Sequence, residues 1–299
     1  MLVQRGEFAA LATALCWTIT ALSFESAGRR VGSLSVNLLR LVLALVPLGI
    51  FGWITRGRFL PTDASLHAWI WLGLSGIVGF TLGDLFLFRA FVLVGARTTM
   101  LISMSLAPIL AALTGWRLLG DRLTPLDWVG MAITLAGVAW VVLERQGSGS
   151  VVERSNRRGG ILLGIGAGVG QAAGLILAKF GMGAFPAFAA SQIRVLAGAL
   201  GFTVLFFAIG RWPRVRAAIA DRPAMARIAL GAFFGPFLGV SFALHAIQNA
   251  ATGVAATIMA LVPVFIIAPA MLLFRERVSA RALLGAVVAV GGVALLFLQ

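Results

Sequence analysis

The feature that most constrains this chain is a succession of long apolar segments separated by short polar connections. A helix needs roughly 20 mostly apolar residues to cross a bilayer. About ten segments meet this length, near residues 7–26, 34–54, 68–90, 98–117, 126–144, 160–180, 188–209, 227–246, 253–274 and 281–298. They occupy most of the 299 residues and leave no room for a separate soluble domain. We therefore expect an all-α membrane protein with about ten transmembrane helices.

The composition excludes several other classes of protein. Charged residues make up 11% of the chain, against roughly 25% in ordinary soluble domains. The single cysteine, Cys16, cannot form an intrachain disulfide, and we expect neither a metal site nor a cofactor. The net charge of +14 comes from residues scattered between apolar segments. This pattern is typical of membrane-protein loops and does not indicate a nucleic-acid partner.

The two halves of the sequence repeat each other. Shifts of 154 to 156 residues place Arg40 on Arg194, Gly83 on Gly239, Pro108 on Pro263, Asp121 on Glu276, Gly130 on Gly285 and Gly137 on Gly292. Each half holds about five segments, and an odd number makes the second half enter the membrane from the opposite side. We predict two inverted five-helix repeats, over residues 1–145 and 160–299, with a linker over 146–159.

Several short motifs accompany the repeat. Between Ala90 and Val142 the chain carries Gly95-Ala96-Arg97, Ser105-Leu106-Ala107-Pro108 and Leu119-Gly120-Asp121-Arg122-Leu123; the second copy carries Leu261-Val262-Pro263-Val264-Phe265 and Phe274-Arg275-Glu276-Arg277. Over nearly its whole length the chain resembles the EamA family of the drug/metabolite transporter superfamily. In the first repeat Asp121 stands where that family usually has glutamate. The resemblance implies a ten-helix inner-membrane carrier with a central cavity that moves small metabolites, often outward, and implies no particular substrate.

Ionisable side chains inside apolar segments need a reason, because isolated charges are costly in a membrane. Arg40 and Asp84 fall at similar depth in the second and third segments, which predicts an ion pair. The pair is either structural or a gate, with Asp84 as a candidate group for a coupling proton or an ammonium group. Arg194 repeats Arg40, but Val240 stands where Asp84 would repeat. We expect Arg194 to bind a substrate carboxylate or helix-end carbonyls.

Further candidates are neutral or lie near the segment ends. Trp17 and Gln171 match between the repeats and are expected to line a central cavity. His245 is a candidate coupling residue, or it lines the entrance. Pro108 and Pro263 lie within apolar segments, where each frees a carbonyl and allows a bend. They are hinge candidates, or simple packing kinks.

Together these features predict a secondary transporter that moves a small organic metabolite, amino-acid-like or similar, outward across the inner membrane by alternating access. No phosphate-binding loop accompanies the apolar segments, so protons or a substrate gradient are the expected drive. The alternative is an integral-membrane enzyme acting on lipid or prenyl substrates, which would need clustered carboxylates that the segments lack. Most Lys and Arg residues fall on the side opposite the N-terminus, which predicts that both termini lie outside.

Overall fold

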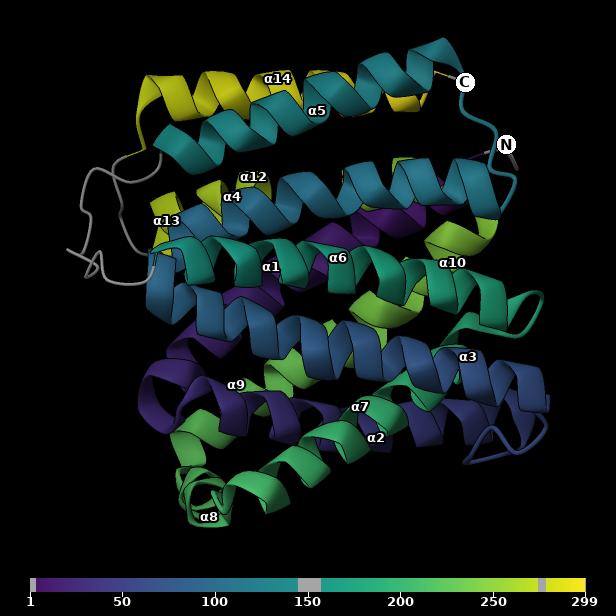
Figure 1. The fold of residues 1–299 in the computed structure, drawn as a ribbon, viewed down its shortest axis with the longest axis vertical. Helices are drawn as coiled ribbons and strands as arrows, with labels where there is room; N and C mark the ends of the chain where they lie inside the picture. Colours follow the sequence, from purple (N-terminus) through teal and green to yellow (C-terminus); the bar gives the residue numbers. More distant parts are fainter. Residues whose placement is uncertain (1–3, 145–156, 274–277, 299) are drawn as a thin grey trace.

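The computed structural model describes residues 4–144, 157–273 and 278–298, and within these ranges it consists of helices and their connections. Nine helical segments in this part of the chain are long and apolar enough to span a membrane, and the apolar helix Ala280–Leu296 adds a shorter tenth. The helices run side by side, with both chain termini at one end of the bundle (Figure 1). The predicted all-α membrane architecture is confirmed. We call the end that carries the termini the terminal end.

The helices follow the predicted segments closely. The first half contains α1 (Arg5–Val31), α2 (Ser33–Arg56), α3 (Leu66–Gly76), the π-helix η1 (Ile77–Gly83), α4 (Asp84–Leu118) and α5 (Pro125–Glu144). The second half contains α6 (Arg157–Met182), α7 (Ala187–Ile209), α8 (Trp212–Ala220), α9 (Arg222–Ala232), the π-helix η3 (Phe233–Gly239), α10 (Val240–Asn249), α11 (Thr252–Met259), α12 (Val262–Phe265), α13 (Ile267–Leu273) and α14 (Ala280–Leu296). Of the predicted linker 146–159, residues 146–156 lie outside the described residues. Residues 157–159 belong to α6. Glu276 also lies outside the described residues.

The third and fourth predicted segments meet within α4, where we had expected a break between helices. An added Cβ on Gly166, Gly170 or Gly174 of α6 would meet Phe86, Gly83 or Gly79, and one on Gly160, Gly164 or Gly168 would meet Val94, Ile102 or Leu106. As the residue number rises along α6, its contacts fall from Phe86 to Gly79 in the first set and rise from Val94 to Leu106 in the second. The helix α6 is therefore antiparallel to the segment around η1 and parallel to the later part of α4. The chain reverses within α4 while its backbone stays helical (Figure 1).

The two halves repeat each other in three dimensions as well as in sequence. Adding 156 to the bounds of η1, 77 and 83, gives 233 and 239, the bounds of η3. Ser75 Oγ donates to the carbonyl of Gly174 at 2.5 Å, and Thr20 Oγ1 donates to that of Gly231 at 3.4 Å. The two bonds join matching pairs of positions, 75 with 174 and 231 with 20, although the donating hydroxyl comes from the opposite member of each pair.

Helices α5 and α14 carry the same symmetry at one edge of the bundle (Figure 1). A Cβ added to Gly130 would lie 3.1 Å from the carbonyl oxygen of Gly292, and one added to Gly137 would lie 2.7 Å from that of Gly285. Small residues let the two helix backbones approach this closely. Because Gly130 repeats as Gly285 and Gly137 as Gly292, the pseudo-two-fold axis passes between α5 and α14.

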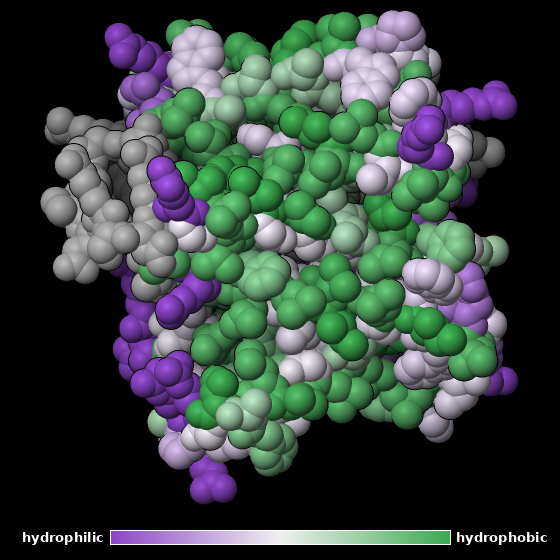
Figure 2. All heavy atoms as spheres, in the orientation of Figure 1, coloured by the Kyte–Doolittle hydropathy of each residue, from purple (hydrophilic) through white to green (hydrophobic). Residues whose placement is uncertain are grey.

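The apolar side chains divide between the interior and the outer surface. One large core cluster joins α1 and α5 to α10, α11 and α14, and a second joins α2 and α7 to α8 and α9. Many large apolar side chains are nevertheless exposed, such as Ile54 at 75% and Leu272 at 80%. On the face that Figure 2 shows, they form a broad apolar band with charged residues toward its two margins. Such a band fits the hydrocarbon core of a bilayer.

Candidate functional site

Arg40 of α2 and Asp84 at the start of α4 form the predicted ion pair. Nη2 of Arg40 contacts Oδ2 of Asp84, and the two side chains are 15% and 14% exposed. The Arg40 guanidinium also lies over the ring of Phe24, 5.4 Å from its centre. The pairing is confirmed, and each charge compensates the other where neither is stable alone. The coupling role of Asp84 stays a prediction.

Arg194 of α7 is buried, and no counter-charge pairs with it in the part of the chain that the structure describes. Its exposed fraction is 5%, and its Nε has no hydrogen-bond partner. The ion pairs found among the described residues do not include it. Its guanidinium lies over the Phe80 ring of η1, 5.0 Å from the centre. A Cβ on Gly79 would lie 3.4 Å from Nη2 of Arg194 and 3.6 Å from Cα of Gly174, which places the guanidinium where α7, η1 and α6 meet.

The repeats also differ at one position beside these arginines. Gly174, beside Gly79, repeats Thr20 of α1. A Cβ on Gly235, the repeat of Gly79, would lie 2.9 Å from Cγ2 of Thr20. The threonine therefore packs its side chain on Gly235 in one half, whereas in the other half Gly174 packs with its backbone on Gly79, where an added Cβ would lie 3.0 Å from Cα of Gly79. In this second half the Arg194 guanidinium lies against the π-helix η1.

Trp17 lies against η3 with its side chain, and Gln171 lies beside η1 with its backbone. A Cβ on Gly239 would lie 2.7 Å from Nε1 of Trp17, and a Cβ on Gly83 would lie 3.9 Å from the backbone nitrogen of Gln171. Both side chains are partly buried. His245 of α10 is exposed, and the contact found for its side chain is with Asn249 on its own helix, at 3.4 Å. Their roles in binding or coupling stay predictions.

The two prolines lie in different backbone settings. Pro263 is in the first turn of α12, directly after the chain leaves the helical ladder of α11. Pro108 lies within α4, which continues through it. A bend at Pro263 therefore has a visible break beside it, whereas Pro108 has lost only its own ladder bond. Whether either acts as a hinge stays a prediction.

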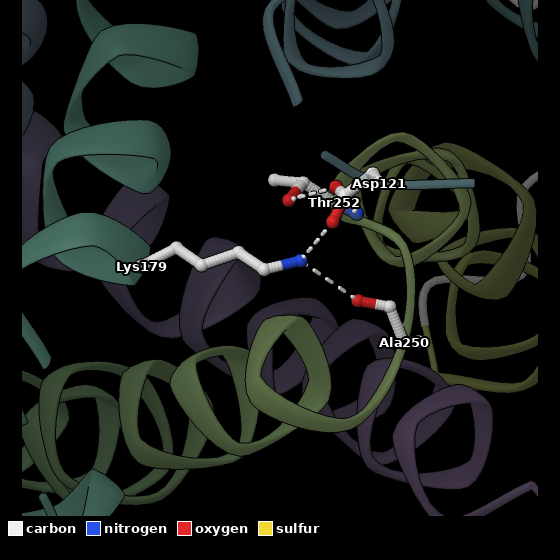
Figure 3. A network of polar contacts seen from close by, with 4 residues as sticks. All are labelled: Asp121, Lys179, Ala250 and Thr252. Carbon is white, nitrogen blue, oxygen red and sulfur yellow. Dashed lines mark hydrogen bonds and ion pairs between the residues drawn. The ribbon is translucent and has the colours of Figure 1, made fainter. Parts of the chain in front are cut away.

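Sequence reasoning missed a polar network at the terminal end, in which Asp121 contacts residues of the second repeat. Oδ1 of Asp121 accepts from Nζ of Lys179 at 2.6 Å, and Oδ2 accepts from both the backbone nitrogen and Oγ1 of Thr252 at 2.7 Å (Figure 3). Lys179 also donates to the carbonyl of Ala250 at 3.2 Å. We call these four residues the latch. Asp121 comes from the first repeat and the other three come from the second, so the latch joins the two repeats.

The latch lies at the terminal end and is shielded from water. The backbone around Ala250 packs on Gly6 at the start of α1, and Gln4 donates to the carbonyl of Phe297 near the C-terminus. The Asp121 side chain is 8% exposed and that of Lys179 is 19% exposed. Burial raises the pKa of Asp121, but hydrogen bonds from Lys179 and Thr252 outweigh it and hold the pKa below its ordinary value. Asp121 therefore stays ionised at neutral pH.

A small cavity lies next to the latch. Its volume is about 240 Å³, and it is lined by Leu119, Lys179, Met182, Gly183 and Gln248. Gln248 of α10 donates to the carbonyl of Gly183, at 2.7 Å, and to that of Phe185, which tie α10 to the α6–α7 connection. In the part of the chain that the structure describes, no three His, Cys, Asp or Glu side chains are grouped as a metal site.

Comparison with known proteins adds the family. The model of the EamA-like transporter family matches residues 4–143 and 158–298, once for each repeat. A solved structure titled "Crystal structure of protein" is similar in fold, with a TM-score of 0.78, 20% sequence identity and coverage of 100% of this chain and 97% of that one. No curated protein matches the sequence. The two matches of the family model cover nearly the whole chain, which therefore belongs to the EamA-like transporter family.

Proposed function

We propose that this transporter is a secondary carrier that moves a small organic metabolite, amino-acid-like or similar, outward between its two repeats by alternating access. The observation that carries the proposal is the latch. It joins one inverted repeat to the other at the terminal end through hydrogen bonds that can break and re-form. Inverted repeats supply two related gates around a site near the bilayer midplane, and a closed gate needs contacts of this kind across the repeats.

The latch, the π-helices and the break before Pro263 have different roles in such a cycle. Opening the terminal end requires Asp121 to separate from Lys179 and Thr252, since these contacts join the repeats. The π-helices η1 and η3 lie at matching places beside Arg194 and Trp17, where a solute between the repeats would pass. Wide π-turns inside α-helices occur frequently at functional sites. The break before Pro263 offers a place where the second half can bend.

Orientation and coupling complete the proposal. The excess of Lys and Arg at the end opposite the termini favours that end as cytoplasmic. The latch then closes the outer side of the inner membrane, with both termini outside. Protons are the candidate coupling ion, and Asp84 is the candidate carboxylate, because its partner Arg40 could stabilise its charge between proton-binding events. A reporter fused after Gln299 tests the orientation, and activity of a reporter that works only in the cytoplasm would refute it.

The proposal is tested by uptake into proteoliposomes, with amino acids, amines and nucleosides offered together and read by mass spectrometry. We expect saturable uptake of one chemical class, accelerated when the same solute is loaded on the opposite side. Asp84→Asn should remove the response to a pH gradient and leave exchange intact. Absence of uptake by folded protein would contradict the carrier. Covalently altered lipid or prenyl compounds in the same spectra would favour the membrane-enzyme alternative instead.

A further inference from the structure

The side chain of Arg194 is the observation that the fold does not explain. A guanidinium carries five N–H donors and a permanent charge. Here it is 5% exposed, its Nε has no hydrogen-bond partner in the described chain, and its guanidinium lies over the aromatic face of Phe80. The repeat-related Arg40 is neutralised by Asp84. An uncompensated charge of this kind is strongly unfavourable unless something else meets it.

A second unpartnered group lies on the same face of α7. Ser191 precedes Arg194 by three residues, and side chains at this spacing are neighbours on a helix. Its Oγ is fully buried and has no hydrogen-bond partner. Gly79 and Gly174 leave the space beside Nη2 of Arg194 free of side-chain atoms of their own. Within the described chain, one buried nitrogen of the guanidinium and one buried hydroxyl thus have no hydrogen-bond partner, one helical turn apart.

We propose that Arg194 and Ser191 receive the carboxylate of the transported solute, beside η1. The inference rests on the proposed carrier function and narrows its substrates to solutes with a carboxylate group. A carboxylate carries one negative charge and two oxygens, which match the guanidinium fork. Phe80 holds the guanidinium from one face and leaves its edge donors for the ligand. The same charge that is unfavourable in the empty protein then supplies the affinity.

The subsite also belongs to one repeat only. Thr20 places a side chain at the position equivalent to Gly174 in the other half, and Arg40 is paired with Asp84. A solute bound at Arg194 is therefore held asymmetrically, by its carboxylate at α7 and by other contacts elsewhere. We therefore expect removal of the carboxylate from a solute to weaken its binding more than a change in the rest of its structure does.

The test uses purified full-length protein and matched probes: amino acids, their amides and the corresponding decarboxylated amines. Binding is read as a rise in the melting temperature in detergent, since a ligand that binds only the folded state stabilises it. Flux of the same probes is read in proteoliposomes. The variants are Arg194→Gln, Arg194→Lys and Gly79→Ala, with exposed Arg214→Gln as the charge-removal control. Gly79→Ala keeps the charge and places a methyl group at ordinary contact distance, 3.4 Å, from Nη2.

We expect the acids, and neither the amides nor the amines, to stabilise the wild-type protein and to be transported. Arg194→Gln should raise the half-saturating concentration of the acid about tenfold or more, Arg194→Lys by less, and Arg214→Gln not at all. If Arg194→Gln does not fold, a weakened acid response in Gly79→Ala carries the test. Inorganic phosphate and chloride at equal ionic strength should not reproduce the stabilisation.

The outcomes separate the subsite from the carrier function. Stabilisation by the acid that depends on Arg194, without flux, would uphold the subsite and refute the carrier. Flux of amides or amines that is indifferent to Arg194→Gln and Gly79→Ala would uphold the carrier and overturn the subsite. Equal stabilisation by acid and amide, or by chloride, would also overturn the subsite.

Discussion

Replacing Asp121 by asparagine should open the terminal end without disturbing the rest of the fold. The change keeps the shape of the side chain and an oxygen that can accept from Thr252, but it removes the ion pair with Lys179 at 2.6 Å. A hydrogen bond to a charged group contributes about 1.5–3 kcal/mol. Taking about 2 kcal/mol for this largely buried pair, the closed state should lose about thirtyfold in its ratio to the open state.

The assay is the rate at which a cysteine behind the latch reacts with a membrane-impermeant maleimide. Met182 is 3% exposed and lines the cavity beside Lys179, so Met182→Cys in a Cys16→Ala background reports opening of that end. When opening is fast relative to labelling, the rate follows the open population. We expect Asp121→Asn and Lys179→Gln each to accelerate labelling about thirtyfold. Both changes together should add little to either alone, because they remove the same contact.

The control is Arg58→Gln, which removes an exposed charge from the connection between α2 and α3. It should leave the labelling rate unchanged. An unchanged rate in Asp121→Asn and Lys179→Gln would refute the reasoning, because the latch would then contribute nothing to closure. Equal acceleration in Arg58→Gln would mean that any loss of charge at the surface has the effect.

Three further predictions follow from the structure. The pKa of Asp121 is lowered from 3.8, so the stabilisation by its ionised form is present above that ordinary value and is lost as pH falls through the lowered pKa. Maleimide reacts with the thiolate, so each rate is divided by that of a free thiol at the same pH; in Met182→Cys protein with an intact latch this ratio should be flat from about pH 5 to pH 8. Arg40→Gln or Asp84→Asn alone should lower the melting temperature more than the two together, since each single change leaves a buried charge unpaired, at about 3 kcal/mol or more; a double variant less stable than both would contradict this. Gly292→Ala should destabilise the protein by about 1–3 kcal/mol in thermal unfolding, because its Cβ would lie 2.5 Å from the backbone nitrogen of Thr134, whereas Gly291→Ala meets nothing within 4 Å and should be neutral.

The parts of the fold that depend on hydropathy could be predicted from the sequence. Each apolar segment has the length of a membrane span. Counting residues along the second and third segments placed Arg40 and Asp84 at similar depth in the membrane, which predicted their ion pair. The spacing of matching glycines also indicated the repeat that later relates η1 to η3. The π-turns themselves could not be predicted, because they depend on how Gly79 and Gly235 pack against other helices.

The latch could not be predicted because its members are far apart in the sequence and act through loop geometry. Asp121 lies in a connection, and one of its partners is a backbone nitrogen at the start of α11. One signal was available: Lys179 is the only lysine in a chain rich in arginine. A single ammonium near the end of an apolar helix suggests a specific carboxylate partner, but the sequence does not say which carboxylate is within reach.

The central claim is that the terminal end must open for a solute to pass, and a reversible cross-link tests it most directly. A Cβ on Gly115 of the first repeat would lie 3.2 Å from Cβ of Thr252 in the second, within a few tenths of an ångström of the roughly 3.5–4.5 Å found in disulfides. It would also lie 2.6 Å from Oδ2 of Asp121, so that carboxylate must move aside and the cross-link replaces the latch contact with Thr252. In a Cys16→Ala background, oxidised Gly115→Cys/Thr252→Cys protein should lose flux in proteoliposomes, and reduction should restore it to the level of the reduced control. Flux that persists in fully cross-linked protein would contradict alternating access through this end.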